Sequence, residues 1–260
     1  MKSLLVVILA ASTAAFADDG PDGTVTLPQG AIAVAGVVGV KVEDVPAAPP
    51  LTSASRVTSE SLSVAAAFGI TSDVTGGVTY AAELHDAEGS FPSNGRWKGP
   101  LLVHGEMRLH AEPLVVVTVG GDVVVHLENS EDRAIHLGVA AAVRLSPMLA
   151  LYTGAPLPNG PAGQQLTIES STNTATSLTV PVGLLVHPAL PVYGFVETKL
   201  AQLSISNSTN RFLFDDFIPV EMGAFYRASD ELDVGLTFSD DLQHPGDRYT
   251  FGLAARYASH

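Results

Sequence analysis

The stretch FIPVEMGAFYRASDELDVGLTFSDDLQHPGDRYTFGLAARY, residues 217–257, decides the fold class of this chain. Aliphatic and aromatic residues such as Met222, Leu236 and Phe251 recur in steps of two, and most residues between them are small, polar or charged. A period of two residues is that of a β-strand with two unlike faces. The pattern occurs three times here, with a polar turn at 229–231, and it predicts three consecutive antiparallel strands.

The same alternation extends upstream and predicts twelve strands in all. Most of them are close to the roughly 9–11 residues that a tilted strand needs to cross a bilayer. The expected strands are residues 30–43, 59–70, 74–84, 100–111, 114–127, 134–145, 149–155, 177–187, 191–205, 216–228, 232–239 and 248–258.

The connections between these strands alternate in length without a break. Transmembrane barrels have short periplasmic turns and longer outer loops, so this alternation predicts an all-β, up-and-down antiparallel barrel. The even strand number places both ends of the barrel on the periplasmic side. The short connections are 71–73, 112–113, 146–148, 188–190 and 229–231, and the long ones are 44–58, 85–99, 156–176, 206–215 and 240–247, with 128–133 the shortest of these.

The beginning of the chain has the three parts of a secretory signal peptide. Lys2 is followed by an apolar core at 4–11 and by a small-x-small cleavage site at 15–17, and the core is too short for a spanning helix. We therefore expect cleavage after Ala17, a short periplasmic segment at 18–29 and a single barrel domain at 30–258.

The composition limits the class of protein further. The chain has no cysteine, so it has no disulfide framework, which suits a bacterial envelope protein. Its formal net charge of −14 argues against nucleic acid as a partner. Charged residues make up 15%, against about 25% in typical soluble proteins, yet no apolar run after the signal reaches the roughly 18 residues of a spanning helix.

A propeller or a soluble β-sandwich would share the period of two. A propeller blade needs four short strands, whereas each repeat here has two long ones. The polar face is rich in Gly, Ala, Ser and Thr, and the solvent face of a soluble sandwich would carry more charge. Apolar-face aromatics mark two membrane interfaces: Phe68, Tyr226 and Tyr257 near the turns, and Tyr80, Phe238 and Tyr249 near the loops.

These features together resemble the bacterial outer-membrane β-barrel proteins, over essentially the whole chain after the signal. The last strand of that family carries a polar-x-Gly-x-x-apolar-x-aromatic signal, and Thr250, Gly252, Ala255 and Tyr257 occupy its four positions. Ala255 is only weakly apolar, and residues 258–260 extend past the usual terminal aromatic. The resemblance implies an outer-membrane location, recognition by the barrel assembly machinery and contact with outer-membrane lipid or lipopolysaccharide.

With the apolar face outward, charged and imidazole side chains line the lumen. The functional interpretation is a water-filled pore, and the alternative is a lumen closed by its own side chains, as in barrels of modest strand number. Selectivity is expected from Glu106, Arg108, Asp122, Arg144, Glu197 and Lys199. The further predicted lining residues are His104, His126, His136, Glu221, Arg227 and Arg256.

Two histidines in this set raise the question of a metal. The hairpin around 128–133 is expected to place His126 opposite His136, with Asp122 on the same face. Imidazoles beside a carboxylate can hold a divalent cation. No spacing signature accompanies the pair, so a polar cross-strand contact is favoured, and neither a metal nor a cofactor is expected.

An outer-membrane hydrolase is the third hypothesis. Barrel lipases use a His-x-Ser pair, but none of the eight histidines is followed two residues later by Ser or Thr. The sequence therefore favours a non-enzyme: a passive channel for small polar solutes, with a structural or surface-interaction barrel with a filled lumen as the alternative.

Overall fold

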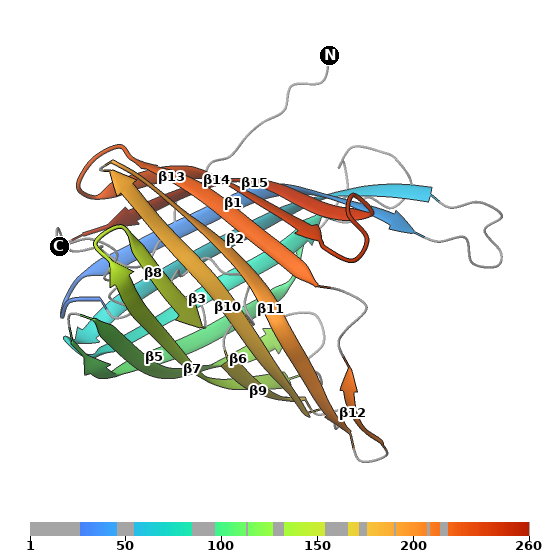
Figure 1. Cartoon of the computed structure of the whole chain (residues 1–260), viewed down its shortest axis with the longest axis horizontal. Helices are drawn as coiled ribbons and strands as arrows, with labels where there is room; N and C mark the ends of the chain where they lie inside the picture. The colour runs from blue at the N-terminus through green and yellow to red at the C-terminus, as the bar shows by residue number, and fades with distance from the viewer. Residues whose placement is uncertain are drawn as a thin grey trace.

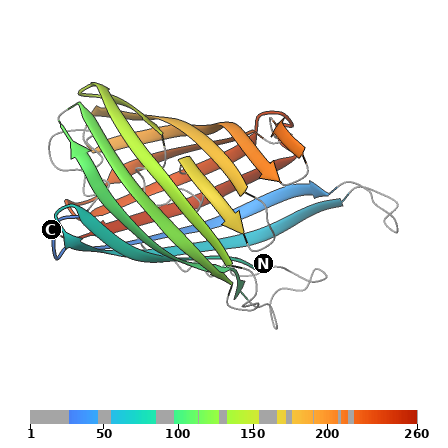
Figure 2. The same ribbon diagram turned by 90° about the horizontal axis from the view of Figure 1, so that it is seen from below.

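The chain folds into a closed antiparallel β-barrel, seen in Figures 1 and 2. This computed structural model describes residues 27–45, 55–84, 97–112, 114–126, 133–153, 166–171, 176–189, 191–206, 209–213 and 218–259. Within these residues the wall has twelve strand positions, and no helix is long and apolar enough to cross a membrane. The predicted fold class is confirmed.

The strands follow the predicted ranges closely. They are β1 (Ile32–Val45), β2 (Ser55–Thr71), β3 (Val74–Leu84), β4 (Trp97–Lys98), β5 (Pro100–Ala111), β6 (Val115–His126), β7 (Arg133–Ser146), β8 (Leu149–Thr153), β9 (Leu166–Ser171), β10 (Thr176–Ala189), β11 (Val192–Ser206), β12 (Thr209–Leu213), β13 (Pro219–Arg227), β14 (Leu232–Asp241) and β15 (Arg248–Ala258).

The first and last strands close the barrel. β1 pairs with β15 from Ala33 opposite Ala258 to Glu43 opposite Arg248. Beyond the ladder, the Ser259 amide donates to the Ile32 carbonyl at 2.8 Å. We call the end that holds the short connections the turn end and the opposite one the loop end. The β1–β2 pair and the β11–β12 pair extend far at the loop end (Figure 1).

The two faces of the wall are oriented as predicted. Outward side chains such as Met222, Leu236 and Phe251 are 41–48% exposed. Inward neighbours on the same strands, such as Phe225 and Ala254, are 5% exposed or less. Because apolar side chains are the ones left on the outer surface, this surface suits hydrocarbon and not water.

One wall position is shared by two short strands, which corrects the prediction of a loop at 156–176. β8 pairs with the turn-end part of β7 and with β10, and β9 pairs with the loop-end part of β7 and with β10. The long edges of β7 and β10 extend beyond Thr153, and their backbone amides and carbonyls need hydrogen-bond partners there. Residues 166–171 provide those partners. Their alternation, Leu-Thr-Ile-Glu-Ser-Ser, is only six residues long and lies within a stretch rich in Gly, Pro, Asn, Ser and Thr, so the sequence predicts a loop there.

Two further strands lie within predicted loops. In the predicted loop 85–99, β4 pairs with the loop end of β3. In the predicted loop 206–215, β12 pairs with the loop end of β11, beyond Thr198, where the pairing of β11 with β13 ends.

The chain segment before β1 folds into the turn end of the barrel. Leu27 is 1% exposed and packs against Ala31, Ala33, Ala67 and Ala258. Its amide donates to Thr75 Oγ1 at 2.7 Å. The carbonyl of Pro28 passes so close to Gly69 that a Cβ there would overlap it. Leu27 therefore fills space beside the small side chains of the first two strands.

We expect Leu27→Ala to lower the free energy of unfolding by about 2–5 kcal/mol, because it removes a fully buried side chain and leaves a cavity. Urea unfolding of the folded barrel in lipid vesicles measures this change. Gln29→Ala, an exposed position in the same segment, is the control and should stay within about 0.5 kcal/mol of the parent. Equal stability of the two variants would contradict the buried position of Leu27.

Candidate functional site

Four aromatic side chains point into the lumen on neighbouring strands. These are Tyr152 on β8, Tyr193 and Phe195 on β11, and Phe225 on β13, which we call the aromatic cluster. All four are 9% exposed or less. Leu185 of β10 and Ala254 of β15 pack with them, and Val37 of β1 lies against the cluster.

Glycines in adjacent strands make room for these rings. A Cβ on Gly183, Gly223 or Gly235 would overlap the ring of Tyr152, Phe195 or Phe225, respectively. Each glycine stands on the strand that follows its ring's strand in the wall. Aromatic rings that cover glycines in this way protect the exposed backbone of a sheet and fix its register.

A hydrogen-bonded ionic network adjoins the aromatic cluster near the turn end. Arg256 Nη1 donates to Tyr193 Oη at 2.7 Å, and Tyr193 Oη donates to Asp233 Oδ2 at 2.8 Å. Arg227 Nε lies 3.6 Å from Asp233 Oδ1. We call Tyr193, Arg227, Asp233 and Arg256 the Tyr193 network; it joins β11, β13, β14 and β15.

The same network also holds Arg256 against aromatic faces. The Arg256 guanidinium carbon is 5.7 Å from the Tyr193 ring centre and 5.6 Å from that of Phe225, and the two rings stack at 5.2 Å. Arg256 is 3% exposed. A charge buried so far is stable only with close partners, and here it has a hydroxyl and two ring faces. The network can therefore brace four consecutive strands on the lumen side of the wall.

The predicted arginines lie at one level of the barrel. Arg108, Arg144, Arg227 and Arg256 are all within three residues of the turn end of their strands. Arg108 does not reach across the lumen, because its Nη2 forms an ion pair with Asp73 Oδ1 at 2.7 Å in the β2–β3 turn. Arg144 stands opposite Ala150 of β8.

The predicted glutamates lie at the next level toward the loop end. Glu106, Glu197 and Glu221 are five or six residues from the turn end of β5, β11 and β13. Glu197 and Glu221 are direct cross-strand neighbours, and Glu197 is 4% exposed. Among the predicted lining residues, arginines therefore lie toward the turn end and glutamates above them, while Asp233 is paired with arginines at the lower level.

The histidine pairing expected from sequence is wrong. The β6–β7 register places Asp122 opposite His136, whereas His126 is opposite Pro100 of β5. His136 Nδ1 is 2.7 Å from Asp122 Oδ1. The error comes from the hairpin, whose centre lies two residues earlier than assumed, so that His126 is shifted toward the loop end.

His104 is opposite Asp122 on the other side of β6, but its ring lies over Gly77 of β3. His104, Asp122 and His136 therefore occupy one row without converging on a common point. Among the residues that the structure describes, no group of three His, Cys, Asp or Glu side chains could hold a metal ion. The side chains of His126 and Lys199 lie outside the described residues.

The sequence prediction missed the aromatic cluster. Phe195 and Phe225 share the inward period with Glu197 and Arg227, but they were not singled out because large aromatics were expected on the outer face. The signal that could have identified them is the glycine placed across from each ring in the next strand, Gly223 and Gly235.

No protein-family model matches the sequence, and no curated protein matches it. Solved structures do match the fold. The KdgM porin in complex with disordered oligogalacturonate gives a TM-score of 0.55 at 5% identity, covering 88% of this chain and 99% of that one. An outer membrane channel from Pseudomonas putida F1 gives 0.52 at 11% identity, covering 90% and 97%.

The NanC porin gives a TM-score of 0.52 at 6% identity, covering 86% of this chain and 98% of that one. At such identities the likeness concerns the fold. The chain thus has the closed twelve-strand barrel fold of these outer-membrane porins and channels, and the fold implied by the resemblance is confirmed.

We expect Tyr193→Phe to lower the free energy of unfolding by about 1.5–3 kcal/mol. The ring stack with Phe225 remains, but the charged side chains of Arg256 and Asp233 each lose a buried hydrogen bond with the Tyr193 hydroxyl. Tyr226→Phe, on the outer face of β13, is the control and should change stability by less than about 0.5 kcal/mol. Urea unfolding in lipid vesicles compares the two, and an unchanged Tyr193→Phe would contradict the network.

The Arg108 guanidinium beside Asp73 holds the pKa of that carboxyl below its ordinary value. Because the pKa is lowered, the ion pair stabilises the fold fully at pH values above the ordinary carboxyl pKa. This stabilisation is lost as the pH falls through the lowered pKa of Asp73. Carboxyl NMR titration should therefore give Asp73 a midpoint below that of a free Asp side chain. In Arg108→Ala the midpoint should rise; an unchanged midpoint would refute the ion pair.

Proposed function

We propose that this chain is an outer-membrane channel for small polar solutes. The observation that carries the proposal is the closed barrel with an apolar outer face and an inner face on which layers of arginine and glutamate follow each other. Such a barrel places a polar path inside a wall that suits lipid. Three solved structures with this fold are described as two porins and an outer membrane channel, which is consistent with the proposal.

The proposal extends to how the chain reaches the membrane. Residues 1–17 would direct export and be removed after Ala17. Residues 18–29 would form a short segment on the periplasmic side, from which Leu27 enters the turn end of the barrel. Thr250, Gly252, Ala255 and Tyr257 on β15 would be read by the barrel assembly machinery. The outer face would contact outer-membrane lipid, including lipopolysaccharide.

The aromatic cluster and the Tyr193 network would form the constriction of the channel. They extend from β8 to β15 and meet Val37 of β1, so they occupy the lumen between several wall strands. Charges of both signs at this level are paired within the network. Arg256 and Glu197 are 3% and 4% exposed, so they would act on a passing solute through their electrostatic field and not by direct contact. Selectivity by charge would follow from the order of the two layers.

The burial of the inner face favours a second candidate, a structural barrel with a filled lumen. Inward side chains are 5% exposed or less both near the turn end, as at Ala33, and toward the loop end, as at Leu102. Barrels of modest strand number commonly fill their interior with side chains. In this case the chain would act through its outer surface and loops.

Single-channel recording in planar lipid bilayers separates the two candidates. Parent protein is expected to give discrete steps, and Phe225→Ala should enlarge them because it removes a ring from the constriction. The matched control is Tyr226→Ala, which truncates the next residue on the lipid face and should leave the step size unchanged. Absence of steps in both the parent and Phe225→Ala would refute the channel and leave the filled barrel.

A further inference from the structure

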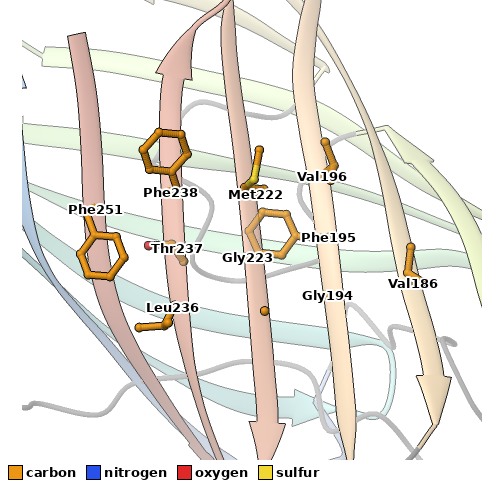
Figure 3. Close-up of a pocket in the computed structure, with 11 residues that line it drawn as sticks. Val186, Gly194, Phe195, Val196, Met222, Gly223, Leu236, Thr237, Phe238 and Phe251 are labelled. Atoms are coloured by element: carbon orange, nitrogen blue, oxygen red, sulfur yellow. The ribbon is translucent and has the colours of Figure 1, made fainter. Parts of the chain in front are cut away.

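The outer face of the barrel has a groove at the strands β10, β11, β13, β14 and β15. Figure 3 shows the side chains that border it, among them Val196, Met222, Leu236, Phe238 and Phe251. The hollow has a volume of about 390 Å³, within the range of roughly 300–1,000 Å³ that small-molecule sites have. Val196, Met222 and Phe251 are 41–47% exposed, so the groove opens on the outside of the wall. Phe195, Gly223 and Thr237, from the inward-facing positions of the same strands, also border it.

Small residues create the depth of this groove. Gly194 and Ala224 are outward positions on β11 and β13 that face each other across the ladder. Their large neighbours on the same strands, Val196 and Met222, stand beside them on the same face. Figure 3 shows Gly194 without a side chain between the bordering residues. The outer surface is therefore indented at this pair and raised around it.

The length of the groove suits an extended hydrocarbon chain more than a single protein side chain. It runs from Val186 on β10 to Phe251 on β15, which is four strand spacings or about 19 Å at roughly 4.8 Å each. One protruding side chain of a second copy would fill only part of that length. An extended hydrocarbon chain can follow all of it.

The position of the groove indicates where the polar headgroup of a lipid would lie if its hydrocarbon chain occupied the groove. Phe238 borders the groove, and its ring stacks on Tyr249 with centres 6.4 Å apart. Tyr249 stands at the loop end of β15, and aromatic residues at strand ends lie at the level of lipid headgroups. From Phe251 near the loop end of β15, the groove descends across the wall to Val186 and Gly194, which are three and two residues from the turn ends of β10 and β11.

We propose that this groove is a binding site for a lipid acyl chain of the outer leaflet. The proposal rests on the membrane location given under the proposed function. A groove left unfilled within hydrocarbon would forfeit the dispersion contacts of its apolar lining. A chain that follows the groove from Tyr249 downward supplies those contacts and keeps its headgroup at the interface.

Photo-crosslinking in nanodiscs tests the site. The discs contain phosphatidylethanolamine and phosphatidylglycerol, with a fraction of phosphatidylethanolamine that carries a diazirine in its acyl chain. Peptide mapping after irradiation should show labelling concentrated on β13 and β14, above the level on the outward residues of β2 and β5. Ala224→Leu, which fills the indentation, should reduce the β13–β14 labelling to the level of those other strands.

The matched control is Ala66→Leu, the same substitution at an outward position of β2 outside the groove, which should leave the labelling pattern unchanged. Even labelling around the barrel in the parent protein, or labelling of β13 that survives Ala224→Leu, would overturn the site. Crosslinks between β13 and a second copy that Ala224→Leu abolishes would also overturn it, because the occupant would then be protein. No labelling of any outward strand would refute the membrane location itself.

Discussion

The need to pair every backbone amide and carbonyl within the wall governs this structure. In hydrocarbon no water is available to satisfy these groups, so a sheet can cross a membrane only when it closes on itself. The β1–β15 pairing provides that closure over eleven residue pairs. The same requirement explains β9, which continues the ladder of β7 and β10 where β8 ends. Both features satisfy backbone hydrogen bonds, and they do so whatever side chains the strands carry.

Side-chain size on the inner face varies around the wall, and the two sides are complementary. β1 and β2 present alanines such as Ala33, Ala35 and Ala67, and these are 4% exposed or less. Leu27 fills the space beside this thin side at the turn end, and the aromatic cluster fills space from the other strands. In the described part of the chain, the rings on β8, β11 and β13 meet the first strand only at Val37, so the small side chains of β1 and β2 leave space that these rings partly fill.

The sequence predicted the strand ranges and the orientation of the faces because both depend on local alternation. Met222, Leu236 and Phe251 could be placed outward from their spacing alone. It could not predict β9, whose residues pair because two long neighbours lack partners there, a condition that depends on tertiary structure. The histidine register failed for a similar reason: Asp122 and not His126 faces His136 because the hairpin centre is set by the whole ladder.

The lining residues were predicted as a set, but their contacts were not. Arg108 shares the period of its neighbours, yet the Asp73 carboxylate holds it at the turn. Tyr193 is one inward residue of β11 among several in the sequence pattern. It becomes the centre of a network only because Arg227, Asp233 and Arg256 are cross-strand neighbours beside it in the folded barrel. Spacing along one strand does not reveal which side chain three strands away will lie against it.

The wall position shared by β8 and β9 makes the barrel modular at that point. The chain leaves the ladder at Thr153, opposite Ala141, and rejoins it at Leu166, opposite Val139. Each half is held in register by its own pairs with β7 and β10, so neither half depends on the length of chain that joins them. Sequence can be added or removed between these two points during evolution without shifting any other strand, at a site in the middle of the wall and not at its rim.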